Sequence, residues 1–364
     1  MNSSPFINQV RAWLDQQVTP VANAIDSDSE QLRAVFAAMA QQGWLALRRP
    51  VEFGGPDLAE PEWREFQEAI ARASGALAFL QTQHQSAVAM IARSHNQALK
   101  QRTLPSMHDG TVTIAIGFSQ LRRPGPPLLR AKVVPGGFRL DGHLPWITGQ
   151  SFFQDVLLAA QLPDGSAVFG ITPFADADGP DGGTLRLSAP MRLAAMGAAR
   201  TVTADLTGWH LPEDQVVFQR PAGWIHTNDT INIALQGFFA IGCAQGSLDQ
   251  VEALVPRRGS FVHDALTALR EELSICRDKL HASDAKTDPE SRLELRAWAI
   301  ELAVRCAHAA IAVTGGSANA EDSPVQRRYR EALVFTVSAQ TIAVQAATLS
   351  RLAYGRATKP PLNG

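Results

Sequence analysis

Apolar residues recur along the chain with two different spacings, and the changes between them divide the sequence into three zones. Up to about residue 110 they return every three or four positions, as in WREFQEAIARASGALAFL, which predicts amphipathic helices. In the second zone, short runs such as RTVTADL alternate apolar and polar residues, with Gly, Pro and Asp between the runs, which predicts strands. After about residue 220 the helical spacing returns and holds nearly to the end.

This order predicts an α+β protein with three domains. We expect an N-terminal α-helical domain over residues 1–110, a middle antiparallel β-barrel domain over 111–219, and a C-terminal four-helix bundle over 220–364. Several of the last helices have apolar faces too broad for a single neighbour, so they also predict packing against another subunit.

Composition narrows the class of protein. Hydrophobic residues make up 45% of the chain and charged residues 19%, which is typical of a globular enzyme and excludes a disordered chain. The formal net charge is -2, so no basic surface for nucleic acid is predicted. No stretch reaches about 18 uninterrupted apolar residues, and the first residues read as an amphipathic helix and not as a signal peptide. We therefore expect no membrane span and a cytoplasmic location.

The three cysteines are Cys243, Cys276 and Cys306. They are odd in number, far apart and form no CxxC pair, so neither a disulfide framework nor a metal site is predicted. Each lies in an apolar, helix-like stretch, where a free cysteine acts as a small buried hydrophobic residue.

Short motifs in the second and third zones carry the candidate chemistry. The strand DGHLPWITG contains Trp146, Ile147 and Thr148, and upstream of it the run IGFSQ contains Gly117, Phe118 and Ser119. The last zone contains the runs RGSF, with Arg258 and Phe261, and VTGGSAN, with Gly315 and Gly316, followed by an REA triplet and Thr341.

In this order the motifs resemble the acyl-CoA dehydrogenase family of flavoproteins across nearly the whole chain. The resemblance implies FAD as cofactor, with the tryptophan of W-I-T beside the flavin ring and the threonine offering a hydroxyl and a backbone N–H near N5. It also implies that Arg258 reaches the FAD pyrophosphate of a neighbouring subunit, for which a guanidinium is well suited. The implied cofactor-binding residues are Gly117, Phe118, Ser119, Trp146, Ile147, Thr148, Arg258, Phe261, Gly315, Gly316 and Thr341.

The sequence departs from the family pattern at several of these places. The family's acidic T-E-P motif is missing from the loop after Phe118, where Arg122 and Arg123 are candidates for holding a phosphate or carboxylate. Leu269 and Ala312 occupy positions where the family often has glutamines on the adenine half of FAD. The FAD site is therefore expected to be only partly retained.

The family's catalytic base has no counterpart in this sequence. The usual glutamate position corresponds to Ala339, and the alternative position on an earlier helix corresponds to Asn232. Neither side chain can act as a carboxylate base. A relocated base has four candidates, each expected to be a helix cap or a solvated charge: Glu321, Asp322, Glu301 and Asp229.

Three functions remain open. The favoured one is an oxidoreductase acting on the CH–CH bond of an acyl-CoA or related acyl thioester, with catalytic residues unknown. The second is a flavin-dependent monooxygenase using reduced flavin and oxygen, for which His84, His95 and His143 would be tested. The third is an inactive binding scaffold. The resemblance also implies a homodimer or homotetramer and is compatible with an electron-transfer or reductase partner.

Overall fold

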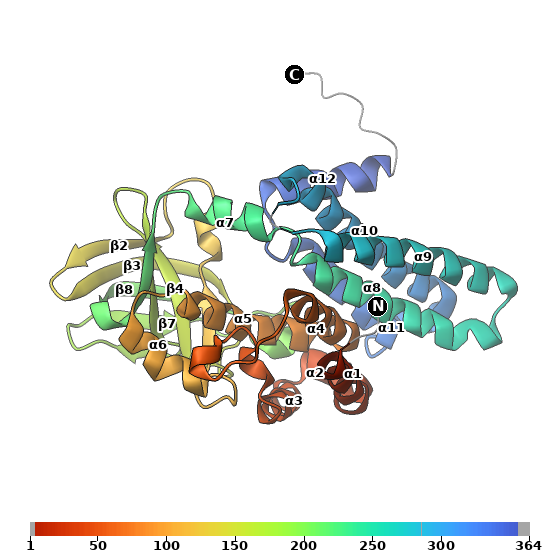
Figure 1. Ribbon diagram of the computed structural model, residues 1–364, viewed down its shortest axis with the longest axis horizontal. Helices are drawn as coiled ribbons and strands as arrows, with labels where there is room; N and C mark the ends of the chain where they lie inside the picture. The colour runs from red at the N-terminus through yellow and green to blue at the C-terminus, as the bar shows by residue number, and fades with distance from the viewer. Residues whose placement is uncertain (1–3, 285, 356–364) are drawn as a thin grey trace, which may run out of the picture. The chain divides into compact units, whose positions relative to one another are not determined.

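The computed structural model describes residues 4–284 and 286–355, and its elements follow the predicted order of helices, strands and helices (Figure 1). The first helices are α1 (Pro5–Gln17), α2 (Ala24–Ser27), α3 (Ser29–Gln41), α4 (Glu60–Ala73), α5 (Gly75–Ala92) and α6 (Gln97–Thr103). The strands are β1 (Ile114–Gly117), β2 (Leu129–Val134), β3 (Gly137–Ile147), β4 (Asp155–Gln161), β5 (Ala167–Pro173), β6 (Ala177–Asp178), β7 (Thr184–Leu187), β8 (Val202–Pro212) and β9 (Val216–Arg220). The last helices are α7 (Trp224–Asn232), α8 (Gly237–Leu254), α9 (Ser260–Ala282), α10 (Pro289–Thr314), α11 (Pro324–Val337) and α12 (Ile342–Tyr354). The α+β fold class is confirmed.

The elements form two compact units, each assembled from segments that are far apart in the sequence. The bundle unit contains the described parts of residues 1–26, 60–78 and 229–364, and the sheet unit contains residues 27–59 and 79–228. The predicted domains follow the chain, whereas each of these units combines some of the N-terminal helices with a later zone.

The sheet unit is built around a nine-stranded sheet in the order β6-β7-β8-β3-β2-β4-β5-β9, with β1 paired to β4 beside this path. Most neighbours are antiparallel, as predicted, but β1 and β2 both pair with β4 in parallel, which the sequence pattern did not indicate. Helices α5 and α6 pack on this sheet: Val88, Ile91 and Leu99 share a buried core with Leu157 and Phe169. This packing explains the continuous apolar character of β4 and β5.

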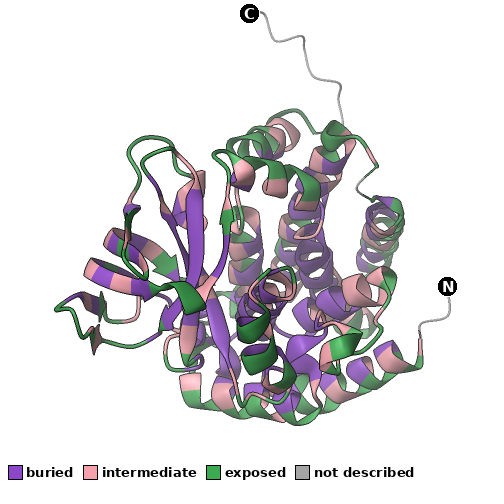
Figure 2. Ribbon diagram, turned by 60° about the vertical axis from the view of Figure 1, so that its left-hand side comes forward, coloured by how far each residue is buried: buried purple, intermediate pink, exposed green. Residues whose placement is uncertain are grey.

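In the bundle unit, α8 packs against α4, α9, α10 and α11, and Figure 2 shows buried residues along the bundle helices. Two glycines let α8 approach α4 closely. A Cβ at Gly242 would lie 2.3 Å from the backbone oxygen of Glu68, and one at Gly246 would lie 2.6 Å from that of Arg72. The four-residue spacing of these glycines places both on the face that meets α4.

The last predicted helix is in fact two helices, which corrects the expectation of four long helices in this zone. Helix α11 ends at Val337 and α12 begins at Ile342. Between them Ala339 adopts φ 46°, in the left-handed region that interrupts a right-handed helix. Thr341 then caps α12, because its side chain accepts a hydrogen bond from the Val344 N–H at 3.2 Å. Apolar residues continue through the break, so the hydrophobic pattern did not reveal it.

Two segments, Trp224–Arg257 and Pro289–Thr314, are long and apolar enough to cross a membrane. At least half of the apolar window of each is buried inside the protein, as in the core helices of many folded domains. All three cysteines are buried and free, as predicted. Burial raises the pKa of each thiol to about 12.

Candidate functional site

The sheet unit brings together two of the predicted cofactor-binding segments. Gly117 ends β1, Ile147 ends β3, and a Cβ added to Gly117 would lie 3.2 Å from the Ile147 side chain. Phe118 and Ser119 follow β1 directly. The Arg122 guanidinium lies 5.8 Å from the Phe118 ring, which is a cation–π distance. The ends of β1 and β3 therefore lie close together, which brings the two motifs near each other.

At the end of β3, Trp146 is 38% exposed, whereas Thr148 is 1% exposed. The Thr148 hydroxyl lies 3.0 Å from that of Thr201, which is also buried, so the two side chains satisfy each other. An exposed aromatic face beside a fixed, buried hydroxyl is a suitable border for a planar ring ligand.

The loops next to Thr148 contain strained backbone. Ser151, Met196 and Arg200 all have positive φ, at 68°, 58° and 49°. Each such non-glycine residue costs about 1–2 kcal/mol. The loops hold each other: Gln150 N donates to Arg200 O at 3.1 Å, and Arg200 Nε donates to the Gln150 side-chain oxygen at 2.8 Å. Strain of this kind accumulates at functional sites, which agrees with a ligand site at the end of β3.

In the bundle unit a second group of predicted residues lies near the end of α10. Arg258 is exposed, and its Nη2 donates to the carbonyl of Thr314, next to Gly315, at 3.3 Å. Gly315 has φ 78°, and a Cβ at Gly315 or Gly316 would meet no heavy atom within 4 Å. Phe261 is 71% exposed. This region therefore offers an accessible backbone and a cation, whereas the side chain of Thr341, the remaining predicted residue, caps α12.

The REA motif forms a buried ionic cluster. Glu331 is completely buried. Its Oε2 accepts a hydrogen bond from Arg328 at 2.9 Å, and its Oε1 accepts from the Gly75 N–H at 3.0 Å and from Arg327. Burial raises the pKa of Glu331, whereas Arg327 and Arg328 lower it. The combined effect of the arginines is the stronger one, so the pKa lies below its ordinary value. Arg330 pairs with the buried Asp26 at 3.0 Å. This cluster ties α11 to the start of α5 and is structural.

Both positions that the resemblance assigns to the base lie next to backbone carbonyls bound by buried arginines of α10. Arg296 Nη2 donates to Ser338 O, beside Ala339, at 2.8 Å, and Arg292 Nη1 donates to Ile231 O, beside Asn232, at 2.7 Å. Neither arginine was among the site residues predicted from the sequence. A signal was available, because Arg292, Arg296 and the buried Ile300 follow each other at four-residue intervals on one helix face.

The four candidates for a relocated base differ in their burial and in their charge partners. Glu301 is buried, and its oxygens lie 2.6 Å from Arg351 and 3.6 Å from Arg305, so the expectation of a cap or solvated charge was wrong for this residue. The apolar spacing of α10 turns Glu301 inward, where the arginines compensate its charge. Glu321 and Asp322 are exposed, in agreement with solvated charges, and Asp229 lies in α7.

The histidines provide little support for a monooxygenase. His84 is fully buried: its Nδ1 accepts from the Ile114 N–H at 3.0 Å, and its Nε2 donates to Met107 O at 2.9 Å. Burial lowers the pKa of His84, so the ring is neutral and structural. His143 Nδ1 lies 2.8 Å from Asp205 on the surface, and His95 is exposed.

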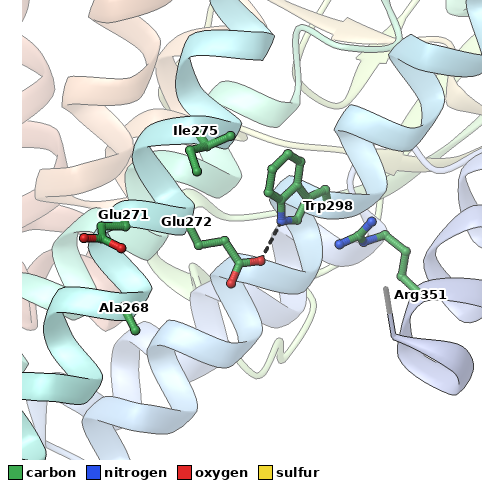
Figure 3. Close-up of a pocket in the computed structure, with 6 residues that line it drawn as sticks. All are labelled: Ala268, Glu271, Glu272, Ile275, Trp298 and Arg351. Carbon is green, nitrogen blue, oxygen red and sulfur yellow. Dashed lines mark hydrogen bonds between the residues drawn. The ribbon is translucent and has the colours of Figure 1, made fainter. Parts of the chain in front are cut away.

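A groove of about 520 Å³ runs over α9, α10 and α12 (Figure 3). It is lined by Ala268, Glu271, Glu272, Ile275, Trp298 and Arg351. In Figure 3, Glu272 points toward Trp298 and accepts its indole N–H at 2.9 Å. Arg305 also donates to both oxygens of Glu272, and Arg351 pairs with Glu301. The charges of Glu272 on α9 and Arg351 on α12 are thus compensated, and none of the predicted site residues lines the groove.

Comparisons with known proteins agree with this arrangement. Residues 4–111 match the family description "Acyl-CoA dehydrogenase, N-terminal domain", and residues 262–341 match "Acyl-CoA dehydrogenase, C-terminal domain". A 3-(aryl)acrylate reductase of Clostridium sporogenes is 22% identical over 358 residues, covering 92% of this chain and 94% of the relative. The mitochondrial isovaleryl-CoA dehydrogenase of Pongo abelii is 26% identical, covering 96% of this chain and 86% of the relative.

A solved structure of glutaryl-coenzyme A dehydrogenase with glutaryl-CoA superimposes with a TM-score of 0.80 at 18% identity, covering 98% of this chain and 97% of that one. Helices, a central sheet and a helical bundle in this order define the class of fold, that of the acyl-CoA dehydrogenases. With matches at both ends to the family's own domains, the chain belongs to the acyl-CoA dehydrogenase family.

Proposed function

We propose that the protein is an FAD-dependent oxidoreductase acting on the CH–CH bond of an acyl-CoA or related acyl thioester. The observation that carries this proposal is the membership of the family, together with the W-I-T motif at the end of β3, where Trp146 is partly exposed. Relatives named for isovaleryl-CoA and aryl acrylates, and a neighbour solved with glutaryl-CoA, support an acyl substrate.

The residues present fit a flavin. Trp146 offers an exposed ring face, and the bond between the Thr148 and Thr201 hydroxyls fixes a polar group beside it. The open backbone at Gly315 and Gly316 and the exposed Arg258 suit a phosphate-bearing chain. When bound, FAD would supply the acceptor or donor of reducing equivalents for the CH–CH bond.

The proton that leaves or joins the substrate carbon needs a group other than Ala339 or Asn232. Glu301 is unsuitable as a general base, because the guanidinium groups of Arg305 and Arg351 compensate its charge and occupy its oxygens. The proposed chemistry therefore depends on a proton acceptor outside the family's two usual positions.

The surface of the bundle unit supports a homodimer or homotetramer. Large apolar side chains are exposed along α11 and α12, namely Leu333, Val337, Ile342, Leu349 and Leu352. Apolar faces of this kind commonly pack against a second copy in an oligomer. We further propose a cytoplasmic location and an electron-transfer or reductase partner that exchanges electrons with the flavin.

The test is the visible absorption spectrum after incubation with FAD and desalting, followed by anaerobic titration with a panel of acyl-CoA thioesters. A retained flavin band that is bleached by an acyl-CoA is the expected result. Retained flavin without bleaching, together with oxygen uptake when the flavin is reduced, would favour the monooxygenase. A protein that retains no flavin would favour the scaffold.

A matched pair of variants tests the cofactor site. Arg258→Met should weaken FAD binding by about tenfold or more, because a guanidinium–phosphate contact is lost. Arg257→Met removes a neighbouring charge that the family resemblance does not assign to FAD and should leave binding unchanged.

A further inference from the structure

Helix α10 carries two buried arginines on one face, Arg292 and Arg296, which are 4% and 1% exposed. Each donates from one terminal nitrogen to a neutral backbone carbonyl, of Ile231 and Ser338 respectively. The Nε of each is also buried and lacks a hydrogen-bond partner. Two guanidinium groups four residues apart on one helix face also repel each other.

Other buried or half-buried arginines in the bundle unit have carboxylate partners. Arg327 and Arg328 share Glu331, and Arg277 pairs with Glu68 at 2.8 Å. In contrast, no carboxylate in residues 4–284 or 286–355 lies within ion-pair distance of Arg292 or Arg296. Burial alone lowers the pKa of Arg296 to about 9, with no acid to oppose it. Uncompensated buried charges are strongly unfavourable, so this pair calls for an anion.

The surroundings of the pair are polar and close to the surface. Ser338 Oγ donates to the Gln236 side-chain oxygen at 3.3 Å, and both residues are half-buried. Ile231 is 54% exposed and Ala339 is exposed, so the guanidinium groups lie one layer beneath the segments that border the two base positions. Guanidinium groups are donors that match the oxygens of a carboxylate.

We propose that Arg292 and Arg296 bind the carboxylate of a small organic acid that enters between the Asn232 and Ala339 segments. Where other family members would place a carboxylate base, this chain places cations, and the ligand brings the negative charge. The proposal rests on the proposed function only where it identifies this acid as part of the substrate. Binding of the acid itself requires no redox activity.

The test compares hexanoate with hexanamide, an uncharged analogue of the same shape, by calorimetric titration and thermal unfolding of the purified full chain at constant ionic strength. Hexanoate should bind and raise Tm, and hexanamide should bind at least about tenfold more weakly. Arg296→Met should weaken hexanoate binding by about tenfold or more. Arg305→Met, on the same helix but paired with Glu272, should bind hexanoate like the wild type.

Several results would overturn the proposal. Equal binding of hexanoate and hexanamide, an equal effect of chloride, or unchanged hexanoate binding by Arg296→Met each exclude a carboxylate site. If Arg296→Met changes the oligomeric state while hexanoate has no effect on the wild type, the missing anion belongs to a second copy. If Arg296→Met does not fold, the comparison of hexanoate with hexanamide on the wild type still tests the carboxylate site. Because this experiment uses no acyl-CoA, a failure to bind hexanoate is distinct from a failure of an acyl-CoA to reduce the flavin.

Discussion

Ala339 combines a side chain with a backbone conformation that favours glycine. At φ 46° its Cβ crowds the following carbonyl. Ala339→Gly should raise the free energy of unfolding by about 1 kcal/mol, measured by urea denaturation. The control is Ala346→Gly in the regular, exposed part of α12, which should lose about 1 kcal/mol. Loss of stability in both variants would show that Ala339 is not strained.

The buried hydroxyl pair at the end of β3 gives a second prediction at this scale. Thr148→Val keeps the shape but leaves the Thr201 hydroxyl buried without its partner at 3.0 Å. The free energy of unfolding should fall by about 1–3 kcal/mol. Thr148→Ser restores the hydroxyl and should recover most of this loss, whereas equal losses in both variants would point to packing.

Individual residues were predictable from sequence where a local motif determines them. Trp146 and Thr148 were singled out by the W-I-T motif, but strand alternation would place both on one face, whereas Thr148 follows the end of β3 and is buried. The burial of Arg296 and Glu301 was not predictable, because charged residues are normally assumed to face solvent and only tertiary packing turns them inward.

Among elements, the contact between α8 and α4 depends on two glycines. Gly242→Ala would place a Cβ 2.3 Å from the Glu68 carbonyl, so the helices must separate. Overpacking of this kind should cost about 1–3 kcal/mol or more in the free energy of unfolding. Gly197→Ala is the control, because its Cβ would meet nothing within 4 Å. Similar losses in both variants would argue against close helix packing.

The cluster around Glu331 predicts how stability depends on pH. Glu331→Gln leaves Arg327 and Arg328 without their counter-charge and should cost about 3–5 kcal/mol at pH 7. Because the pKa of Glu331 is lowered in the folded state, its contribution is complete above its ordinary value of 4.5 and declines as the pH falls below it. Urea midpoints from pH 7 to pH 3 should therefore fall less steeply in the variant than in the wild type.

A surface pair serves as the control for this acid effect. Glu252→Gln, which breaks an exposed pair with Arg270, should cost less than about 1 kcal/mol. If the urea midpoints of the wild type and of Glu331→Gln depend on pH in the same way, Glu331 is not ionised in the folded protein.

Periodicity identified the type of nearly every long element but not its breaks. The interruption between α11 and α12 arises from the backbone at Ala339, a residue type that favours helix. The N-cap residue Thr341 is a local signal of the break, but the apolar spacing that continues through it hid this signal. The parallel pairing of β1 with β4 is equally invisible, since strand partners depend on the path of the whole chain.

For the whole molecule, the exposed apolar side chains of α12 predict an oligomer that a single charge can weaken. Leu352→Glu, at a side chain 57% exposed, should shift the protein toward a monomer in light scattering at micromolar concentration. Val133→Glu places the same charge on an apolar residue of β2 that is 67% exposed, and should leave the mass unchanged. A monomeric wild type would remove the basis of this prediction.

The three cysteines have a practical consequence for future work. At neutral pH their thiols are protonated and shielded, so maleimide reagents should leave the native protein unlabelled. A cysteine introduced at an exposed position, such as Lys132→Cys in the sheet unit or Asp264→Cys in the bundle unit, would then react selectively. Fluorescent dyes attached at both positions would follow the separation of the two units in solution without the removal of any natural thiol.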